Sequence, residues 1–174
     1  TALAAEPQTL AAANGHVDVM TVMLEKLDAG QVLTAATALD KNGRSAMTGA
    51  AVNGRADVMM AMVTAAKEKG AEAAQIAEMF LKKDGKNKNA IEWMSQKTFA
   101  AVREKLPEEV QVHLVTDPRF PPGISVPAGI LHTVFEEVAA LKRRVAELEA
   151  AAQGKPPAGN AGPSTSDSPK LGQG

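Results

Sequence analysis

The chain has 174 residues, a formal net charge of −1 and no cysteine. The absence of cysteine excludes disulfides and thiolate metal sites, and the near-zero charge gives no general reason to expect nucleic acid or an anionic membrane as a partner. No apolar run approaches the ~18 residues of a membrane span. Aromatic residues make up only 3 % of the chain, so the core must consist of aliphatic side chains. Alanine, leucine and methionine are also strong helix formers. The composition therefore predicts an all-α protein with an aliphatic core.

Glycine-containing breaks divide the first two thirds of the chain into short segments. In residues 17–27, Val17, Met20, Leu24 and Leu27 fall on one helical face. Asn14-Gly15 and Asn53-Gly54 are tight turns, because both residue types tolerate the left-handed backbone that ends a helix. Polar turns follow at 40–43 and 83–88. We expect helices at residues 7–13, 17–27, 31–39, 45–51, 57–66, 71–81, 90–95 and 98–106.

One ten-residue phrase occurs twice. Residues 11–20 and 50–59 are identical at seven of ten positions, with an offset of 39 residues (Gly54 minus Gly15). A recurrence at that spacing indicates a repeat architecture, in which each helical repeat buries its apolar face by stacking on the next.

Residues 40–55 resemble the ankyrin-repeat pattern Asp-x-x-Gly-x-Thr-Pro-Leu-His-x-Ala-Ala-x-x-Gly-His. The match consists of Asp40, Gly43, Ser45 for threonine, Met47 for leucine, Ala50, Ala51, Gly54 and Arg55 for histidine. A first repeat without the Asp-containing finger matches at Pro7, Ala11, Ala12, Gly15 and His16. A third aligns Asp84, Ala90 and Ile91 at an offset of 44 (Asp84 minus Asp40), whereas Trp93, Met94 and Ser95 depart from the pattern and Phe99 replaces its histidine.

This resemblance covers about residues 5–106 and implies a short helical solenoid that binds a protein partner through its fingers and the exposed ends of its first helices. Carried over by position, the contact residues are Lys41, Asn42, Arg44, Val52 and Asn53 in the second repeat, Ala13 and Asn14 in the first, and Lys86, Lys88, Gln96 and Lys97 in the third. The competing interpretation is an unrelated array of alanine-rich helical hairpins. For the lysines at 82, 83, 86 and 88, a merely solvated loop is the other alternative.

Residues 107–127 change character. Pro107 and the two glutamates that follow resemble a helix start, and both a helix and a strand fit residues 110–115. Proline-rich residues 116–127 predict a stiff linker. We therefore expect ankyrin-like repeats with a capping helix over 1–115, followed by this linker.

A second pattern predicts a coiled-coil helix over 128–153. Apolar residues alternate at spacings of three and four, which defines a heptad seam formed by Leu131, Val134, Val138, Leu141, Val145 and Leu148. In a parallel pair, Glu137 faces Lys142 of the other copy and Arg144 faces its Glu149. Valine at a with leucine at d favours a homodimer, whereas residues 144–149 also resemble the Arg-h-x-x-h-Glu motif (h apolar) of trimers. Residues 154–174 are rich in glycine, proline and serine and predict a disordered tail.

Catalytic and metal-binding motifs are missing from the sequence. The 40–51 segment fails as a calcium loop because glycine is fourth and alanine twelfth, and no phosphate-binding loop or nucleophile elbow occurs. We expect no catalytic residue, cofactor or metal, and no nucleic-acid or membrane partner. The predicted function is an oligomeric protein-binding adaptor, expected in the cytoplasm, with secretion left open. The alternatives are a C-terminal, non-catalytic part of a larger enzyme, a secreted bacterial effector, and a structural oligomerisation protein. The few repeats also fit the C-terminal end of a longer array.

Overall fold

The computed structural model describes residues 2–154, with side chains from Ala5 onward, and the chain divides into two compact units, Thr1–Val126 and Pro127–Gly174. Within the described residues the protein is all-α, with ten helices and no strand. The first unit contains α1 (Ala2–Ala13), α2 (Val17–Glu25), α3 (Ala29–Thr37), α4 (Ala46–Val52), α5 (Ala56–Glu68), α6 (Ala73–Leu81), α7 (Ala90–Trp93), α8 (Gln96–Lys105) and α9 (Glu108–Val115). Residues 110–115, for which helix and strand both fitted, are therefore helical.

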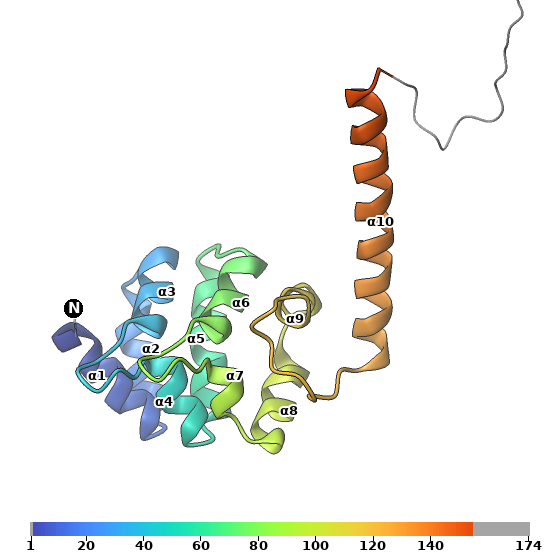
Figure 1. Ribbon diagram of the computed structural model, residues 1–174. Helices are drawn as coiled ribbons and strands as arrows, with labels where there is room; N and C mark the ends of the chain where they lie inside the picture. The colour runs from blue at the N-terminus through green and yellow to red at the C-terminus, as the bar shows by residue number, and fades with distance from the viewer. Residues whose placement is uncertain (1, 155–174) are drawn as a thin grey trace, which may run out of the picture. The chain divides into compact units, whose positions relative to one another are not determined.

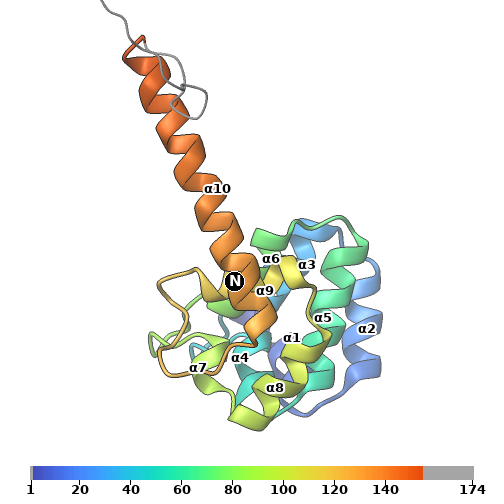
Figure 2. The same ribbon diagram turned by 90° about the vertical axis from the view of Figure 1, so that its right-hand side faces the viewer.

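The helices of the first unit form three rows of three. Rows 1, 2 and 3 are α1–α3, α4–α6 and α7–α9, and each helix packs on its counterpart in the next row: α1 on α4 and α4 on α7, α2 on α5 and α5 on α8, α3 on α6 and α6 on α9 (Figure 1). The turned view shows α3, α6 and α9 grouped together (Figure 2). The same three-helix arrangement therefore occurs three times.

The core between the rows is mostly aliphatic, as the composition predicted, although Phe80 and Phe99 are also buried in it. Met20, Met47, Met59 and Met62 are completely buried. The alanine pair of α4 is also buried, with Ala50 at 0 % and Ala51 at 1 % exposure. Their small side chains let α4 lie close to its neighbours α1 and α7.

The repeated Asn-Gly phrase forms the same turn in rows 1 and 2. Gly15 has φ +75° and Gly54 has φ +68°, a left-handed conformation that glycine adopts without steric cost. The next residue donates its backbone N–H five residues back in both turns: His16 to the Ala11 carbonyl at 2.9 Å and Arg55 to the Ala50 carbonyl at 2.8 Å. The sequence recurrence therefore encodes a recurring backbone structure.

Row 3 departs from the expected alignment. Its first helix, α7, is only four residues long, and α8 begins at Gln96 after Ser95, whose hydroxyl accepts the Thr98 backbone N–H. Phe99, expected at a turn position, is a buried residue of α8. Buried Thr98, Phe99 and Val102 instead follow buried Val58, Met59 and Met62 at an offset of 40 (98 minus 58). The expected helices over 90–95 and 98–106 are thus shifted, and the predicted contact residues Gln96 and Lys97 start the second helix rather than end the first.

Much of the segment predicted as a linker, residues 116–127, packs on the first unit. The Arg119 guanidinium bonds both Glu78 carboxylate oxygens, at 2.7 and 2.9 Å. The Arg119 carbonyl accepts the Asn89 side-chain amide at 2.9 Å, and the Phe120 ring lies 6.0 Å from that of Phe99. Residues up to Val126 therefore belong to the helical unit, and the boundary lies directly before Pro127.

Within the same segment, Arg119 also binds Asp117. The hydrogen bonds from the Arg119 side chain, followed by the one from its backbone N–H, lower the pKa of Asp117 below its ordinary value of 3.8. The bonds to Glu78, and then to Asp117, raise the pKa of Arg119. The charged forms of both groups are thus favoured in the folded protein.

The second unit contains α10 (Ala128–Ala152), which covers the predicted coiled-coil segment. The helix runs without interruption through the heptad positions from Leu131 to Leu148. Among residues 2–154, no helix combines the length and apolar character that crossing a membrane requires. Apart from Gly154, the predicted disordered tail lies outside the described residues.

Candidate partner-binding surfaces

Two loops with the same hydrogen bonds connect the rows, and we name them finger 1 (residues 40–44) and finger 2 (residues 84–88). In finger 1, Asp40 Oδ1 accepts the backbone N–H groups of Asn42 and Arg44, each at 2.9 Å. In finger 2, Asp84 Oδ1 accepts those of Lys86 at 2.8 Å and Lys88 at 3.0 Å. One aspartate therefore organises each loop from inside.

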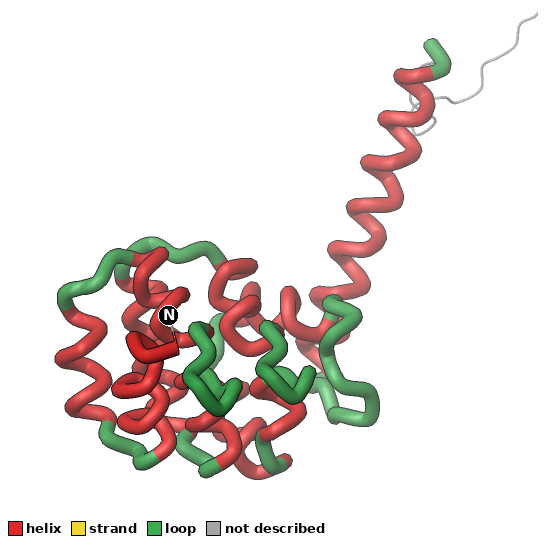
Figure 3. The backbone as a smooth tube through the Cα atoms, turned by 60° about the vertical axis from the view of Figure 1, so that its left-hand side comes forward, coloured by secondary structure: helices red, strands yellow, loops and turns green. Residues whose placement is uncertain are grey.

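The two fingers lie side by side (Figure 3). The Gly85 backbone N–H donates to the Gly43 carbonyl at 2.8 Å. A Cβ atom placed on Gly85 would lie only 2.9 Å from the Gly43 Cα. Glycine at position 85 is thus what permits this close backbone contact.

A small pocket of about 160 Å³ lies between the fingers, lined by Asn42, Gly43, Arg44, Thr48, Val52, Asp84, Lys86 and Trp93. Four of the predicted contact residues, Asn42, Arg44, Val52 and Lys86, therefore lie around one hollow. Pockets for small molecules typically measure ~300–1,000 Å³, so this one has room for little more than a single side chain.

Three other predicted contact residues, Lys41, Asn53 and Lys88, do not line the pocket. The Lys41 ammonium lies 3.1 Å from Glu6 of α1. The Asn53 side-chain amide donates to the Gly49 carbonyl at 2.9 Å and so stabilises the end of α4. The Lys88 ammonium lies 4.5 Å from the centre of the Trp93 ring. Of the positions named for row 1, Asn14 is exposed and Ala13 is half-buried.

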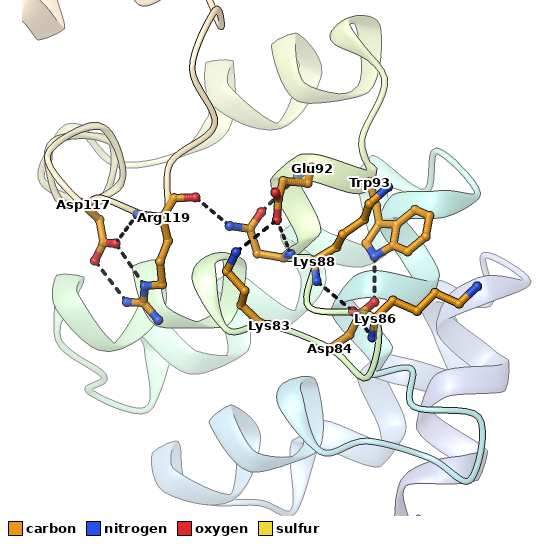
Figure 4. Close-up of polar contacts among 9 residues, drawn as sticks. Lys83, Asp84, Lys86, Lys88, Glu92, Trp93, Asp117 and Arg119 are labelled. Atoms are coloured by element: carbon orange, nitrogen blue, oxygen red, sulfur yellow. Dashed lines mark hydrogen bonds and ion pairs between the residues drawn. The ribbon is translucent and has the colours of Figure 1, made fainter.

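Trp93 is the pocket residue that the sequence analysis missed. Its indole N–H donates to Asp84 Oδ2 at 2.7 Å, and the Lys86 ammonium lies 5.8 Å from its ring centre (Figure 4). It stood out only as a departure from the repeat pattern. A useful signal was available, because it is the one tryptophan of an aromatic-poor chain and lies close to a finger in sequence.

The charges of the fingers are divided between inside and outside. Asp40 is 7 % and Asp84 is 8 % exposed, and the backbone N–H groups of the fingers bind both carboxylates. The cationic side chains of Lys41, Arg44, Lys86 and Lys88 are exposed. Within residues 2–154, the Arg44 guanidinium has no ion pair or hydrogen-bond partner. The outer surface of the fingers is therefore basic.

The second candidate surface is the apolar stripe of α10. Within the described residues its seam is largely uncovered: Leu131, Val138, Leu141, Val145 and Leu148 are 40–63 % exposed. Val134 is half-buried. Phe135, which the heptad assignment omitted, is 67 % exposed beside the seam. Arg144 forms a 3.6 Å ion pair with Glu147 in its own helix, which competes with the predicted pairing to Glu149 of another copy.

Row 1 also exposes apolar side chains, with Leu10, Val19 and Val22 at 49–62 % exposure. Val58, the counterpart of Val19 in row 2 at the offset of 39, is fully buried. The second helices of the three rows are α2, α5 and α8. Val58 is buried because α5 packs between α2 and α8, whereas α2 contacts only α5 among these three helices.

The described residues contain no cluster of three or more histidine, aspartate or glutamate side chains placed to hold a metal ion. Comparison of the chain with protein-family models, with curated proteins and with solved structures yields no match.

Proposed function

We propose that this protein is an adaptor that self-associates through α10 and binds a protein partner through its fingers. The proposal includes the ankyrin resemblance of the helical unit. Three features support that resemblance: the helix–turn–helix pair that begins each row, the Asp-organised fingers, and the buried alanine pair Ala50-Ala51. The third helix of each row is an addition to the two helices of an ankyrin repeat.

The observation that carries the proposal is the uncovered stripe of α10. Tertiary packing of an apolar face normally provides most of the stability of a helix, and the exposed leucines and valines of this helix leave that packing unused. Their spacing of three and four suits the facing stripe of a second copy. Parallel alignment also places Glu137 opposite Lys142 and Arg144 opposite Glu149, which favours this direction by charge.

Light scattering on the full chain tests the association. The variant Leu141→Asp/Leu148→Asp places charges in the seam and is expected to give a monomer with an unchanged first unit. Ala139→Asp/Ala146→Asp introduces the same charges on the outer face of α10 and serves as the matched control, which should associate like the wild type. A monomeric wild type at high micromolar concentration contradicts the proposal. The measured mass of the oligomer, that of a dimer or of a trimer, decides between the valine/leucine dimer pattern and the trimer motif.

Cross-linking tests the binding function. A photoreactive amino acid at Asn42 or Val52, both at the pocket, is expected to form covalent links to a protein partner in cells. The same group at Lys67, which is exposed on α5 away from the pocket, provides the control. Efficient links from Lys67 alone, or none from any position, would contradict partner binding at the fingers. If α10 associates while the fingers capture nothing, a purely structural oligomerisation role replaces the adaptor.

A further inference from the structure

We infer that the fingers bind an acidic peptide segment, with a carboxylate on Arg44 and Lys86 and a neighbouring apolar side chain against Trp93. This inference rests on the proposed function, because it names the chemistry of the partner at the same surface.

The first argument is the charge on the outside of the fingers. The carboxylates of Asp40 and Asp84 are engaged in internal hydrogen bonds, because each accepts two backbone N–H groups of its own finger. The Asp84 carboxylate also holds the Trp93 indole N–H. What an approaching molecule meets is therefore a set of cations, although the whole chain carries a net charge of only −1.

The second argument is the geometry around Arg44. Arg44 and Lys86 line the same pocket from two different fingers, and both residues are exposed. A planar guanidinium binds a carboxylate through two parallel hydrogen bonds, which a lysine alone does not provide. Because the contact between Gly43 and Gly85 keeps the fingers adjacent, the two cations are held ready to bind one carboxylate together.

The third argument is the mixed character of the pocket wall. Trp93 and Val52 provide apolar surface next to the cations, and Asp84 fixes the indole by its 2.7 Å hydrogen bond. The volume of about 160 Å³ suits one side chain rather than a cofactor. An acidic segment that includes an apolar residue therefore complements both parts of the wall.

Single-stranded nucleic acid fits the surface less well. Such ligands stack successive bases on several aromatic side chains. In the first unit, Phe80 and Phe99 are buried at 1 % and 8 % exposure and Phe120 packs on Phe99. Trp93 is thus the one aromatic side chain at the fingers.

Trp93 makes the test direct, because it is the only tryptophan in the chain and its fluorescence reports on the pocket. The full-length protein is titrated with the peptide Gly-Glu-Glu-Leu-Glu-Glu-Gly, and calorimetry measures the same binding independently. The peptide Gly-Gln-Gln-Leu-Gln-Gln-Gly and a short oligothymidylate are the comparison ligands. We expect saturable binding of the glutamate peptide that weakens with salt, and much weaker binding of the other two.

Variants assign the binding to the fingers. Arg44→Ala is expected to weaken the glutamate peptide at least tenfold, and Arg44→Lys by less, because lysine keeps the charge but not the planar fork. Lys67→Ala removes an exposed cation outside the pocket and should leave the affinity unchanged. Since the Arg44 side chain makes no hydrogen bond or ion pair within residues 2–154, its variants should fold normally, which circular dichroism checks.

Three results would overturn the inference: no binding by either method up to about 1 mM peptide, equal affinity for the glutamine peptide, or tighter binding of the oligothymidylate. If cross-links from Asn42 and Val52 to a protein partner persist in that case, the inference fails alone and the adaptor function stands. If the cross-links are absent as well, both fail.

Discussion

Substitution of Gly85 by alanine tests the contact between the two fingers. The added Cβ would lie 2.9 Å from the Gly43 Cα and 3.2 Å from the Gly43 carbonyl oxygen. Both neighbours are backbone atoms, so a side-chain rotation cannot relieve the clash. The fingers must move apart by some tenths of an ångström, which lengthens the 2.8 Å hydrogen bond between Gly85 and Gly43.

The expected cost follows from these contacts. Overpacking typically costs ~1–3 kcal/mol, and a typical intramolecular hydrogen bond contributes ~0.5–1.5 kcal/mol. Since Gly85 is exposed and its loop can shift, we expect a loss of about 1–2 kcal/mol in the free energy of unfolding. For a unit that extends to Val126, this corresponds to a fall in melting temperature of about 3–10 °C.

Thermal unfolding followed by circular dichroism measures the effect, with Gly30→Ala as the matched control. Gly30 lies in the first turn of α3, where an added Cβ meets only Asp28 Oδ1 at 3.5 Å, an ordinary contact. Alanine is a better helix former than glycine by about 1 kcal/mol, so this variant should melt at the same temperature or higher. A wild-type melting temperature for Gly85→Ala would refute the close contact of the fingers.

Three further predictions concern the packing and the charges of the first unit. Ala51→Leu places a large side chain at a position with 1 % exposure and should cost ~1–3 kcal/mol; a melting temperature equal to that of the wild type would show that the position is open. Ser45→Ala removes the side chain that accepts the Thr48 N–H, with an expected loss of ~0.5–2 kcal/mol in urea unfolding; Lys67→Ala should show no such loss. Asp117→Asn should cost about 0.2–1 kcal/mol near neutral pH, as is typical of an ion pair at the protein surface. The folded pKa of Asp117 lies below 3.8, so its stabilisation is present above that value and is lost as the pH falls through the folded pKa. The free energies of unfolding of the variant and the wild type should therefore become equal in acid. A difference that stays constant with pH would contradict this cause.

The sequence alone determined the parts of the fold that depend on local signals. The repeated phrase around Gly15 and Gly54 predicted matching helix–turn–helix structures, because glycine and asparagine set the backbone of the turn. Glycine-containing breaks, together with the apolar spacing of residues 17–27, predicted every helix of rows 1 and 2, although α1 starts at Ala2 and passes through Pro7. Asp40 and Asp84 marked the two fingers, since each aspartate binds N–H groups within four residues of itself.

Only the tertiary structure decided how row 3 and the following segment pack. Phe99 was aligned with a turn, but it occupies the buried position that Met59 has in row 2. Loss of one helical turn from α7 moves every later residue of the row, and spacing within α8 alone cannot reveal such a shift. Residues 116–126 carried proline-rich signals of a linker, yet the contact between Arg119 and Glu78 joins residues 41 apart in the chain.

The candidate site shows the same division. Its outer residues Asn42, Arg44, Val52 and Lys86 could be predicted, because they follow from the positions of the fingers and of the first helix. Trp93 could not, because its role depends on the hydrogen bond to Asp84 and on the adjacent fingers. Local backbone preferences are encoded in neighbouring residues, whereas a pocket between two loops exists only after the rows that carry the loops have packed.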